Sequence, residues 1–446
     1  MNRNTEDVNE DGYEAQSRKK PINILRHFSL ILRFQRLCMS SKTVESMTCH
    51  HDQRTDDGLL RHLADSLGWK SFDSKFPSFA SDPRSVRLGL TSDGFSPYKI
   101  MRTSYTLLWT INDFPTYVNL SGWSTKGRYA CPCCAAQTCS KWLYNGNKFS
   151  YMGHYRWLDG NHRFKFQRTL FDSTEEFKEA PEQTIGSEIL FMLKDINFNY
   201  GTMNQPPNTQ TKRRSSDESE EEGDPNEADL WKKIFFLSCL IGSITFYYTI
   251  LMSCILRKMF GENIIGTILN VDGKLKDNLQ SRLALVDMGI RRDLYPQVLL
   301  NGKYRLSPSI FAILKEEKEV FCMVLKDIKV PDVYASNISR CVSLKDRRLY
   351  SLKSHDYHIL MQDLLPVTLR CCMSKKVTSC IIELSNIMKA ICGKVLNVEE
   401  LKKVQDRATL TLCNLEKIFS PSFFTIMVHL LIHIPREAIL GGLIFY

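Results

Sequence analysis

The sequence predicts an α+β protein in which a region of short strands and loops precedes a mostly helical domain. Residues 37–200 are rich in Trp, Tyr, Phe, Gly and Pro and contain few long periodic runs, which is typical of strands and turns. Beyond residue 260, apolar residues recur at helical spacing between legible helix ends. With 446 residues, 43% of them hydrophobic, the chain can form cores in about two to four domains.

Capping residues predict where the helices of the C-terminal domain begin and end. Ser or Asn before a helix, Pro in its first turn and Gly after its last residue are the usual signals. In chain order these signals are Ser307–Pro308 at the start of a helix, Gly393 after a helix over 378–392, Asn397 with Glu400 in a capping box, and Ser420–Pro421 before "SFFTIMVHLLIHI".

Composition divides the chain into six segments. The first twenty residues are polar and contain no signal-peptide pattern, and residues 201–230 combine prolines with a basic and then an acidic run, which predicts disorder in both. The predicted segments are a disordered N-terminus over 1–20, a first folded region over 21–200, a disordered charged linker over 201–230, an apolar segment over 231–260, a short region over 261–305 and a helical domain over 306–446.

Charge and cysteine usage restrict the cellular setting. Lys and Arg number 59 against 49 Asp and Glu, and the excess of +10 is spread along the chain. A polyanionic partner is therefore permitted, although no basic stripe demands one. Fifteen cysteines, several inside apolar runs such as those around Cys322, Cys380 and Cys413, suit a reducing compartment. The cytosol or the nucleus is favoured.

An uncharged apolar run extends from Phe235 to Leu256, with two lysines before it and Arg257 and Lys258 after it. About twenty apolar residues suffice to cross a bilayer, so residues 234–256 could be a transmembrane helix. Gly, Ser, Thr and Tyr in the middle of the run make insertion less favourable. One alternative for the whole chain is thus a single-pass membrane protein.

The densest chemical signal is a cysteine cluster followed by two histidines. Cys131 and Cys134 form a C-x-x-C pair, in which two thiolates can share one tetrahedral zinc ion. His154 and His162 lie within about thirty residues and could complete the shell. The alternative is a set of reduced cysteines in a small aromatic core.

Two aspartates occupy positions that suit a second kind of metal site. Asp93 in "GLTSDGFSP" and Asp113 in "LLWTINDFP" each follow a short apolar or β-prone run. Paired carboxylates at strand ends can bind two divalent ions for phosphoryl transfer. Both residues are also ordinary turn formers, which is the competing interpretation.

Several long motifs resemble the transposase of plant CACTA-type (En/Spm-like) DNA transposons. The helical segment from "VPDVYASNISRC" to "SFFTIMVHLLIHIPREAILGG" resembles the domain of unknown function that accompanies this transposase. The motifs are "HHDQRTDDGLLRHLADSLGWKSFD", "FASDPRSVRLGLTSDGFSP", "LLWTINDFPTYVNLSGWSTKGRYACPCC", "YMGHYRWL", "NIIGTILNVDGKLKDN" and "MGIRRDL".

The resemblance implies a nuclear, DNA-binding enzyme with an RNase H-like core that uses three acids and Mg²⁺ to cut and rejoin transposon ends. Asp93 would be the first acid and Asp113 the second. A zinc-type insertion containing Cys131, Cys134, His154 and His162 would follow them. In these terms, residues 21–200 are a truncated transposase core with its insertion, and residues 261–305 are a further piece of that core.

The third acid of the family is absent from this sequence. The family carries a motif resembling "HNLDVMHIEKNV" just before "NIIGT". The apolar run occupies the place where the family reads "ELPYW" and later "LDVMHIEK". If family-like codons for "LPYWK" and "LDVMHIEK" are read one nucleotide late, they give Cys239–Ser243 and Leu251–Lys258. We infer a frame-shifted or mis-spliced segment, in which the codon of the catalytic glutamate survives as parts of Leu256 and Arg257.

A second departure concerns the length of the core. Nineteen residues separate Asp93 from Asp113, whereas the RNase H-like fold places several strands and a helix between these acids. At about five residues per strand plus turns, they do not fit. Tyr105 is joined directly to Thr106, as if an internal piece had been deleted.

The sequence therefore predicts a degenerate, catalytically inactive transposase-like protein. Structural Zn²⁺ is the expected metal, and Mg²⁺ would be an ancestral one. DNA is the expected ancestral partner and the nucleus the expected location. The alternatives are membrane attachment through residues 234–256, and a domesticated module whose helical C-terminal domain binds a protein.

Overall fold

The computed structural model describes twelve ranges of the chain. They are 39–43, 48–51, 55–83, 90–92, 110–112, 127–167, 170–171, 178–181, 250–251, 253–271, 273–329 and 337–442. The segments 1–20 and 201–230, together with Asp93 and Asp113, lie outside these ranges.

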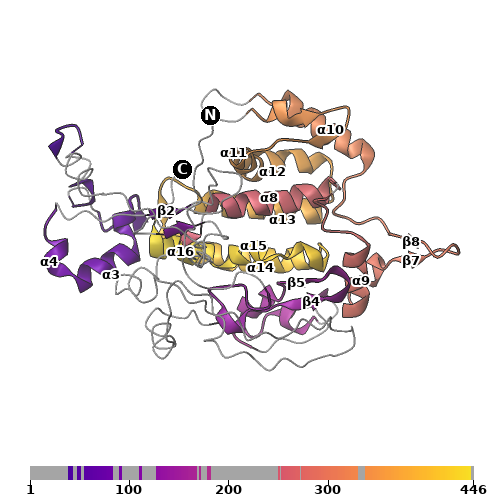
Figure 1. The fold of residues 1–446 in the computed structure, drawn as a ribbon, viewed down its shortest axis with the longest axis horizontal. Helices are drawn as coiled ribbons and strands as arrows, with labels where there is room; N and C mark the ends of the chain where they lie inside the picture. Colours follow the sequence, from indigo (N-terminus) through magenta and orange to yellow (C-terminus); the bar gives the residue numbers. More distant parts are fainter. Residues whose placement is uncertain are drawn as a thin grey trace, which may run out of the picture.

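Two long amphipathic helices form the centre of the helical part (Figure 1). Helix α13 (Lys375–Ile391) packs against α14 (Val398–Glu416), which also contacts α16 (Ile434–Gly441). Each helix turns an apolar stripe inward; residues such as Ile381, Leu384, Val404 and Leu412 are fully buried. Helix α14 also contacts the 3₁₀ turns His154–Trp157 and Leu430–Ile432, which lie at the site described below.

Other helices cover this centre. Helix α8 (Ser253–Ile268) packs on α11 (Ser354–Ile359) and α15 (Ile426–His429). The other helices of the described residues are α3 (Leu67–Lys75), α4 (Pro77–Ala80), α9 (Leu279–Met288), α10 (Lys315–Asp327) and α12 (Leu365–Thr368). The described residues also contain a π-helical turn at Leu360–Leu364 and 3₁₀ turns at Leu63–Asp65, Ala135–Gln137, Tyr144–Gly146, His154–Trp157, Arg163–Phe166, Arg292–Leu294, Ile338–Cys341, Leu369–Cys371, Pro421–Phe423 and Leu430–Ile432.

The strands that the structure describes are short. Antiparallel pairs are β1 (Leu59–Leu60) with β11 (Leu396–Asn397), β4 (Lys141–Leu143) with β5 (Lys148–Ser150), β7 (Gln297–Val298) with β8 (Tyr304–Arg305), and β9 (Val342–Ser343) with β10 (Arg348–Leu349). The first of these pairs joins the N-terminal and C-terminal parts of the chain. A mixed helix and strand content confirms the α+β prediction.

The boundaries between α13 and α14 follow the predicted caps. Helix α13 ends at Ile391, next to the predicted stop, and the Asn397 side chain accepts a hydrogen bond from the Glu400 backbone at the start of α14. The predicted start at Ser307–Pro308 is wrong, because α10 begins only at Lys315. Here the Ile313 backbone N–H donates instead to the Ile268 carbonyl at 3.1 Å, so a tertiary contact holds the preceding chain out of a helix.

The last predicted helix is also divided. Residues 421–423 form a 3₁₀ turn, α15 begins at Ile426, and a second 3₁₀ turn precedes α16. Pro435 stands in the first turn of α16, where its missing N–H costs no hydrogen bond. The predicted helix is therefore interrupted twice, at Phe424–Thr425 and between His429 and Ile434.

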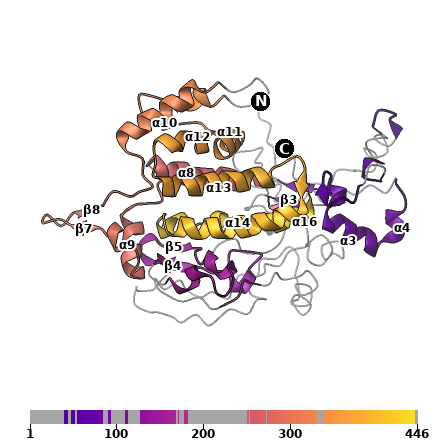
Figure 2. The ribbon, with the colours of Figure 1, turned by 180° about the vertical axis from the view of Figure 1, so that it is seen from behind.

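One buried apolar cluster contains residues from both halves of the chain. Cys131, Cys134, Leu143 and Met152 from the strand-rich part join the helical residues of α8, α9, α13 and α14 in this cluster. Figures 1 and 2 show the β4–β5 segment lying along α14. The strand-rich part is thus packed directly on the helical part.

Three short strands form a parallel sheet of order β2–β3–β6. Strand β2 (Leu90–Ser92) pairs with β3 (Thr110–Asn112) so that Ser92 lies opposite Asn112, and β3 pairs with β6 (Ile250–Leu251). Parallel strands end at the same edge of a sheet, and here that edge immediately precedes Asp93 and Asp113 in sequence.

The apolar run is not supported as a transmembrane helix. Within the described residues, no helix is both long and apolar enough to cross a membrane. Residues 235–249 lie outside the described ranges, whereas Ile250–Leu251 form a strand and α8 starts at Ser253. The Tyr, Thr and Ile residues around this strand favour extended backbone. A rule that considers only length and hydropathy does not include this preference.

Gly266 of α8 allows Lys274 to pack closely against the helix. A Cβ atom at this position would lie 2.9 Å from the Lys274 carbonyl oxygen and 2.8 Å from the Lys274 Cβ. We expect Gly266→Ala to lower the free energy of unfolding by about 1–3 kcal/mol, because backbone atoms must move. Urea denaturation measures the effect. Gly160→Ala is the matched control, since a Cβ there meets nothing within 4 Å, and equal losses would contradict the close approach.

Candidate metal centre

A tight turn presents two cysteines to the core. The Ala135 backbone N–H donates to the Cys131 carbonyl at 3.0 Å, and the Thr138 hydroxyl donates to the Ala135 carbonyl at 2.7 Å. These bonds close the C-x-x-C segment, so that both Cys131 and Cys134 are buried. Their two Sγ atoms therefore face the same neighbouring element.

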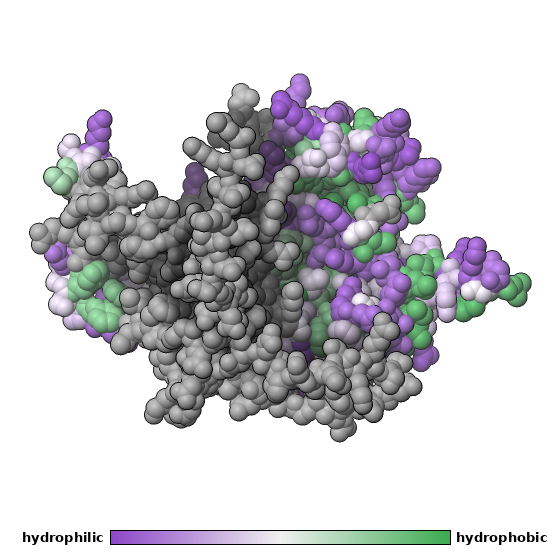
Figure 3. Space-filling model, viewed as in Figure 1, coloured by the Kyte–Doolittle hydropathy of each residue, from purple (hydrophilic) through white to green (hydrophobic). Residues whose placement is uncertain are grey.

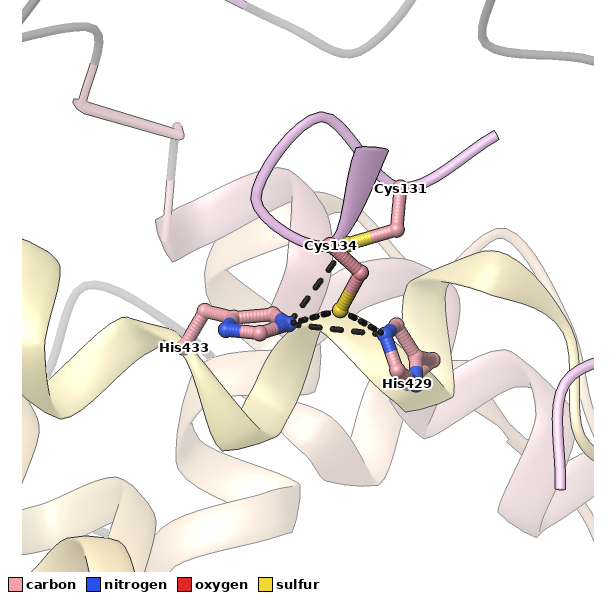
Figure 4. Close-up of side chains that lie close together, drawn as sticks. All are labelled: Cys131, Cys134, His429 and His433. Atoms are coloured by element: carbon pink, nitrogen blue, oxygen red, sulfur yellow. Dashed lines mark hydrogen bonds between the residues drawn. The ribbon is translucent and has the colours of Figure 1, made fainter. Parts of the chain in front are cut away.

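That neighbouring element is the segment from α15 to α16, which supplies two histidines. His429 is the last residue of α15 and His433 directly precedes α16. Side chains four residues apart lie on one face of a helical segment. Figure 4 shows both imidazoles turned toward the two thiols of the cysteine turn.

The four side chains have the distances of a tetrahedral ligand set. The Cys134 Sγ atom lies 3.4 Å from His429 Nε2 and 3.3 Å from His433 Nε2, and the Cys131 Sγ atom lies 3.5 Å from His433 Nε2. The two Nε2 atoms are 3.4 Å apart, and all four ligand atoms lie within 4.8 Å of one another.

Zinc fits this cage. Zn–S bonds of about 2.3 Å and Zn–N bonds of about 2.0–2.1 Å give tetrahedral edges of about 3.6 Å between sulfur and nitrogen and about 3.3 Å between nitrogens. The three sulfur–nitrogen edges and the one nitrogen–nitrogen edge given above are close to these values. Two thiolates with two imidazoles are a usual donor set for structural zinc. The arrangement is a Cys₂His₂ cluster that could bind a metal ion such as zinc.

Burial and neighbouring charges shift the pKa values of His429, His433 and Cys131. Burial, followed by the charges of His433 and His154, holds the pKa of His429 well below its usual range, so its imidazole is available as a neutral ligand. Burial lowers the pKa of His433, but Cys133, Cys131 and Glu437 outweigh this and raise it to about 9. Burial raises the pKa of Cys131. Metal binding therefore has to displace protons from this site.

His154, which the sequence predicts as a ligand, has a different role. Its Nδ1 atom pairs with the Glu416 carboxyl group of α14, and both side chains are completely buried. The same Glu416 Oε1 atom accepts the Gly153 N–H at 2.8 Å and the His154 N–H at 3.1 Å. The His154 ring stands beside His429, with 5.3 Å between ring centroids. The His154 ring thus packs against His429, and His154 is not one of the four side chains of the cluster.

His162 is also outside the cluster. Its Nδ1 atom accepts the Phe164 backbone N–H at 3.2 Å and so caps a 3₁₀ turn. The structure brings together Cys131 and Cys134 as predicted, but it pairs them with His429 and His433. The H-x-x-x-H spacing on a predicted helix was the signal available in the sequence, because that spacing places two ligands on one face.

The two predicted catalytic aspartates, Asp93 and Asp113, lie outside the described residues, as noted above. Only the strands that precede them, β2 and β3, are described.

Comparison with known proteins gives two family matches. Residues 57–108 and 106–196 match the family described as Transposase family tnp2. Residues 391–446 match a domain of unknown function, DUF4218. No curated protein and no solved structure matches the chain.

The chain is therefore transposase-like and carries a C-terminal domain of unknown function. The Cys₂His₂ cluster connects the two matched regions. Cys131 and Cys134 lie in the first, and His429 and His433 lie in the second.

Proposed function

We propose that this protein is a DNA-binding derivative of a CACTA-type transposase that no longer cleaves DNA. It acts in the nucleus, and a structural zinc ion fastens its transposase region to its C-terminal domain. The observation that carries the proposal is the Cys₂His₂ cluster, because it makes one folded body of two regions that both match or resemble parts of a transposon protein.

The parallel sheet supports descent from an RNase H-like core. Strands β2 and β3 pair with Ser92 opposite Asn112, and each strand is followed in sequence by an aspartate. Carboxylates that follow neighbouring parallel strands share one sheet edge, which is the geometry needed to hold divalent ions. Asp93 and Asp113 would have held such ions in the ancestral enzyme.

The position of the first acidic residue in α8, the helix after the third strand, supports the loss of catalytic activity. Strand β6 leads directly into α8, and the first acidic residue of that helix is Glu262, nine residues after Ser253. Nine residues of α-helix span about 14 Å, which takes Glu262 away from the sheet edge. Its carboxylate instead lies 3.5 Å from Lys274 Nζ and 3.4 Å from the Tyr357 hydroxyl. Within the described residues, the first two turns of α8 thus contain no carboxylate, which supports the proposed loss of the third acid.

The family match supports the proposed internal deletion. The match consists of two pieces that overlap at residues 106–108, beside the junction of Tyr105 and Thr106. No residues of this chain separate the two pieces. The match therefore breaks at the junction where the deletion is proposed.

DNA binding and DNA cleavage can be tested separately on the full chain. We expect it to bind duplex DNA with an affinity that falls as salt is raised, because a chain of net charge +10 releases counterions from DNA. With Mg²⁺ or Mn²⁺ it should nick plasmid DNA no faster than its Asp93→Asn/Asp113→Asn variant. Gel shift and plasmid relaxation are the measurements.

One result would contradict the loss of DNA cleavage, and a different result would contradict DNA binding. Metal-dependent nicking that the double variant lacks would show that catalysis persists. Failure of zinc-loaded, folded protein to bind duplex DNA at low salt would remove the DNA-binding function. The double variant should bind DNA at least as tightly as the parent, since it loses two negative charges and no cation.

A further inference from the structure

The β7–β8 hairpin projects from the body of the protein. Figures 1 and 2 show it extending beyond α9 at one end of the molecule. Gln297 pairs with Arg305 and Val298 pairs with Tyr304. A tight turn closes the tip, because the Gly302 N–H donates to the Leu299 carbonyl at 2.9 Å and Gly302 has a φ of 72°. The tip is therefore a defined structure.

A buried arginine fixes the two legs of the hairpin. Arg282 of α9 is paired with Asp277 through bonds of 2.6 and 2.7 Å. It also donates to the Leu294 carbonyl at 2.9 Å and to the Ser307 carbonyl at 3.3 Å. Leu294 precedes the hairpin and Ser307 follows it, so one side chain anchors both legs to α9. This anchoring reduces the entropy that binding would otherwise cost.

The hairpin exposes large apolar side chains to solvent. Leu300 at the tip is 112% exposed, Val298 is 69% exposed and Tyr304 is 47% exposed. Val298 and Tyr304 share one face because they are directly paired. Figure 3 shows apolar side chains at the end of this projection, next to hydrophilic ones. Such an exposed apolar group indicates a binding surface.

The charges of the hairpin identify the kind of partner. Lys303 and Arg305 are exposed on the face opposite Val298 and Tyr304, and neither forms an ion pair within the described residues. From Leu294 to Lys315 the sequence contains no Asp or Glu. A rigid ribbon with unpaired cations and no carboxylate is complementary to a polyanion. A two-stranded ribbon also fits the major groove of B-form DNA.

A second cationic feature lies at the same end of the molecule. Lys148 and Lys276 are half-buried close to each other; burial, and then the charge of Lys276, lower the pKa of Lys148. Lys148 lines an open polar pocket of about 370 Å³ between the β4–β5 turn and the start of α9, with Asn145, Asn278 and Ser422. Within the described residues neither lysine forms an ion pair.

We propose that the β7–β8 hairpin inserts into a groove of duplex DNA, with Lys303 and Arg305 on the phosphates and Leu300 against the bases. Lys148 and Lys276 contact the phosphate backbone of the same DNA, next to the groove that the hairpin enters. The inference rests on the proposed DNA-binding function and assigns its contact surface.

The test measures affinity for a random-sequence duplex at several salt concentrations. Each lost phosphate contact lowers the affinity about tenfold at 0.1 M salt and reduces the slope of log K against log salt by about 0.9. We therefore expect Lys303→Ala/Arg305→Ala to weaken binding about a hundredfold and to reduce the slope by about 2. Leu300→Ser should weaken binding without changing the slope, because it removes no charge.

Matched controls separate the hairpin from general surface effects. Lys394→Ala removes an exposed lysine elsewhere, and Leu410→Ser removes an exposed leucine from α14. Both should bind DNA within about twofold of the parent. Circular dichroism and zinc content confirm that every variant is folded.

The outcomes distinguish this inference from the function on which it rests. Tight, salt-dependent binding by the parent with unchanged hairpin variants would overturn the hairpin assignment alone. Absence of DNA binding by the parent would overturn both. A change of oligomeric state in the hairpin variants at unchanged DNA affinity would assign the hairpin to self-association instead.

Discussion

His433→Ala is expected to abolish zinc binding and to destabilise the protein strongly. His433 lies within 3.5 Å of both cysteine sulfurs and 3.4 Å from His429, so its removal opens the cage. A site with free zinc at about 1,000 times its Kd contributes about 4 kcal/mol to stability, and the variant should lose that amount. Urea unfolding and bound zinc, measured on the same preparation, check this.

His162→Ala is the matched control, because the sequence predicts His162 as a ligand, whereas the structure brings His433 into the cluster. His162 only caps a 3₁₀ turn, and its replacement should cost about 1 kcal/mol with zinc retained. If His162→Ala loses zinc and His433→Ala keeps it, the pairing of the two distant segments is wrong. Addition of a chelator to the parent should reproduce the His433→Ala result.

Replacing Glu416 with leucine is expected to be the other severe substitution. Its Oε1 atom accepts two backbone N–H groups and pairs with the His154 ring inside the core. Removal of this carboxyl group leaves buried donors without an acceptor, which costs about 3–5 kcal/mol. Urea denaturation of Glu416→Leu at constant zinc concentration measures the loss.

Glu383→Leu provides the comparison for Glu416. Glu383 pairs with Arg407 at 2.6 Å, but both side chains are more than a third exposed. Such surface pairs contribute at most about 1 kcal/mol. Similar losses for the two variants would mean that the Glu416 carboxyl group is not buried as described. Because Glu416 holds His154 behind His429, its loss should also weaken zinc binding.

Local signals in the sequence predicted much of the fold. The Asn397–Glu400 cap and the stop near Gly393 located α14 and α13, because capping depends on residues within one turn. The start of α10 could not be predicted in this way. The chain before Lys315 is held by the Ile268 carbonyl, a partner more than forty residues away.

The same distinction explains the metal centre. The cysteine pair was predictable because C-x-x-C brings two thiols together within one turn. The histidine ligands lie 295 and 299 residues from Cys134, and nothing local links them to it. His154 and His162 are nearer to Cys134 in sequence. However, His154 pairs with Glu416, and His162 caps a 3₁₀ turn. Proximity in sequence was a poor guide to proximity in space.

The apolar run illustrates a different limit. Its length and hydropathy satisfy the requirement for a membrane span, although its β-branched and aromatic residues favour a strand. The described part forms β6 and the start of α8. If the frame-shift interpretation is right, its hydrophobicity is a by-product of the altered reading frame. The nucleotide sequence across residues 230–262 tests this, because the shifted frame should restore an "LDVMHIEK"-like motif.

X-ray absorption spectroscopy of the zinc-loaded full chain tests the central claim most directly. The predicted result is one zinc ion per chain with two sulfur ligands at about 2.3 Å and two nitrogen ligands at about 2.0–2.1 Å. The His429→Ala variant should lose that signal while His154→Ala retains two sulfur and two nitrogen ligands. Folded protein without zinc, or zinc bound by three or more sulfurs, would contradict the site formed by Cys131, Cys134, His429 and His433.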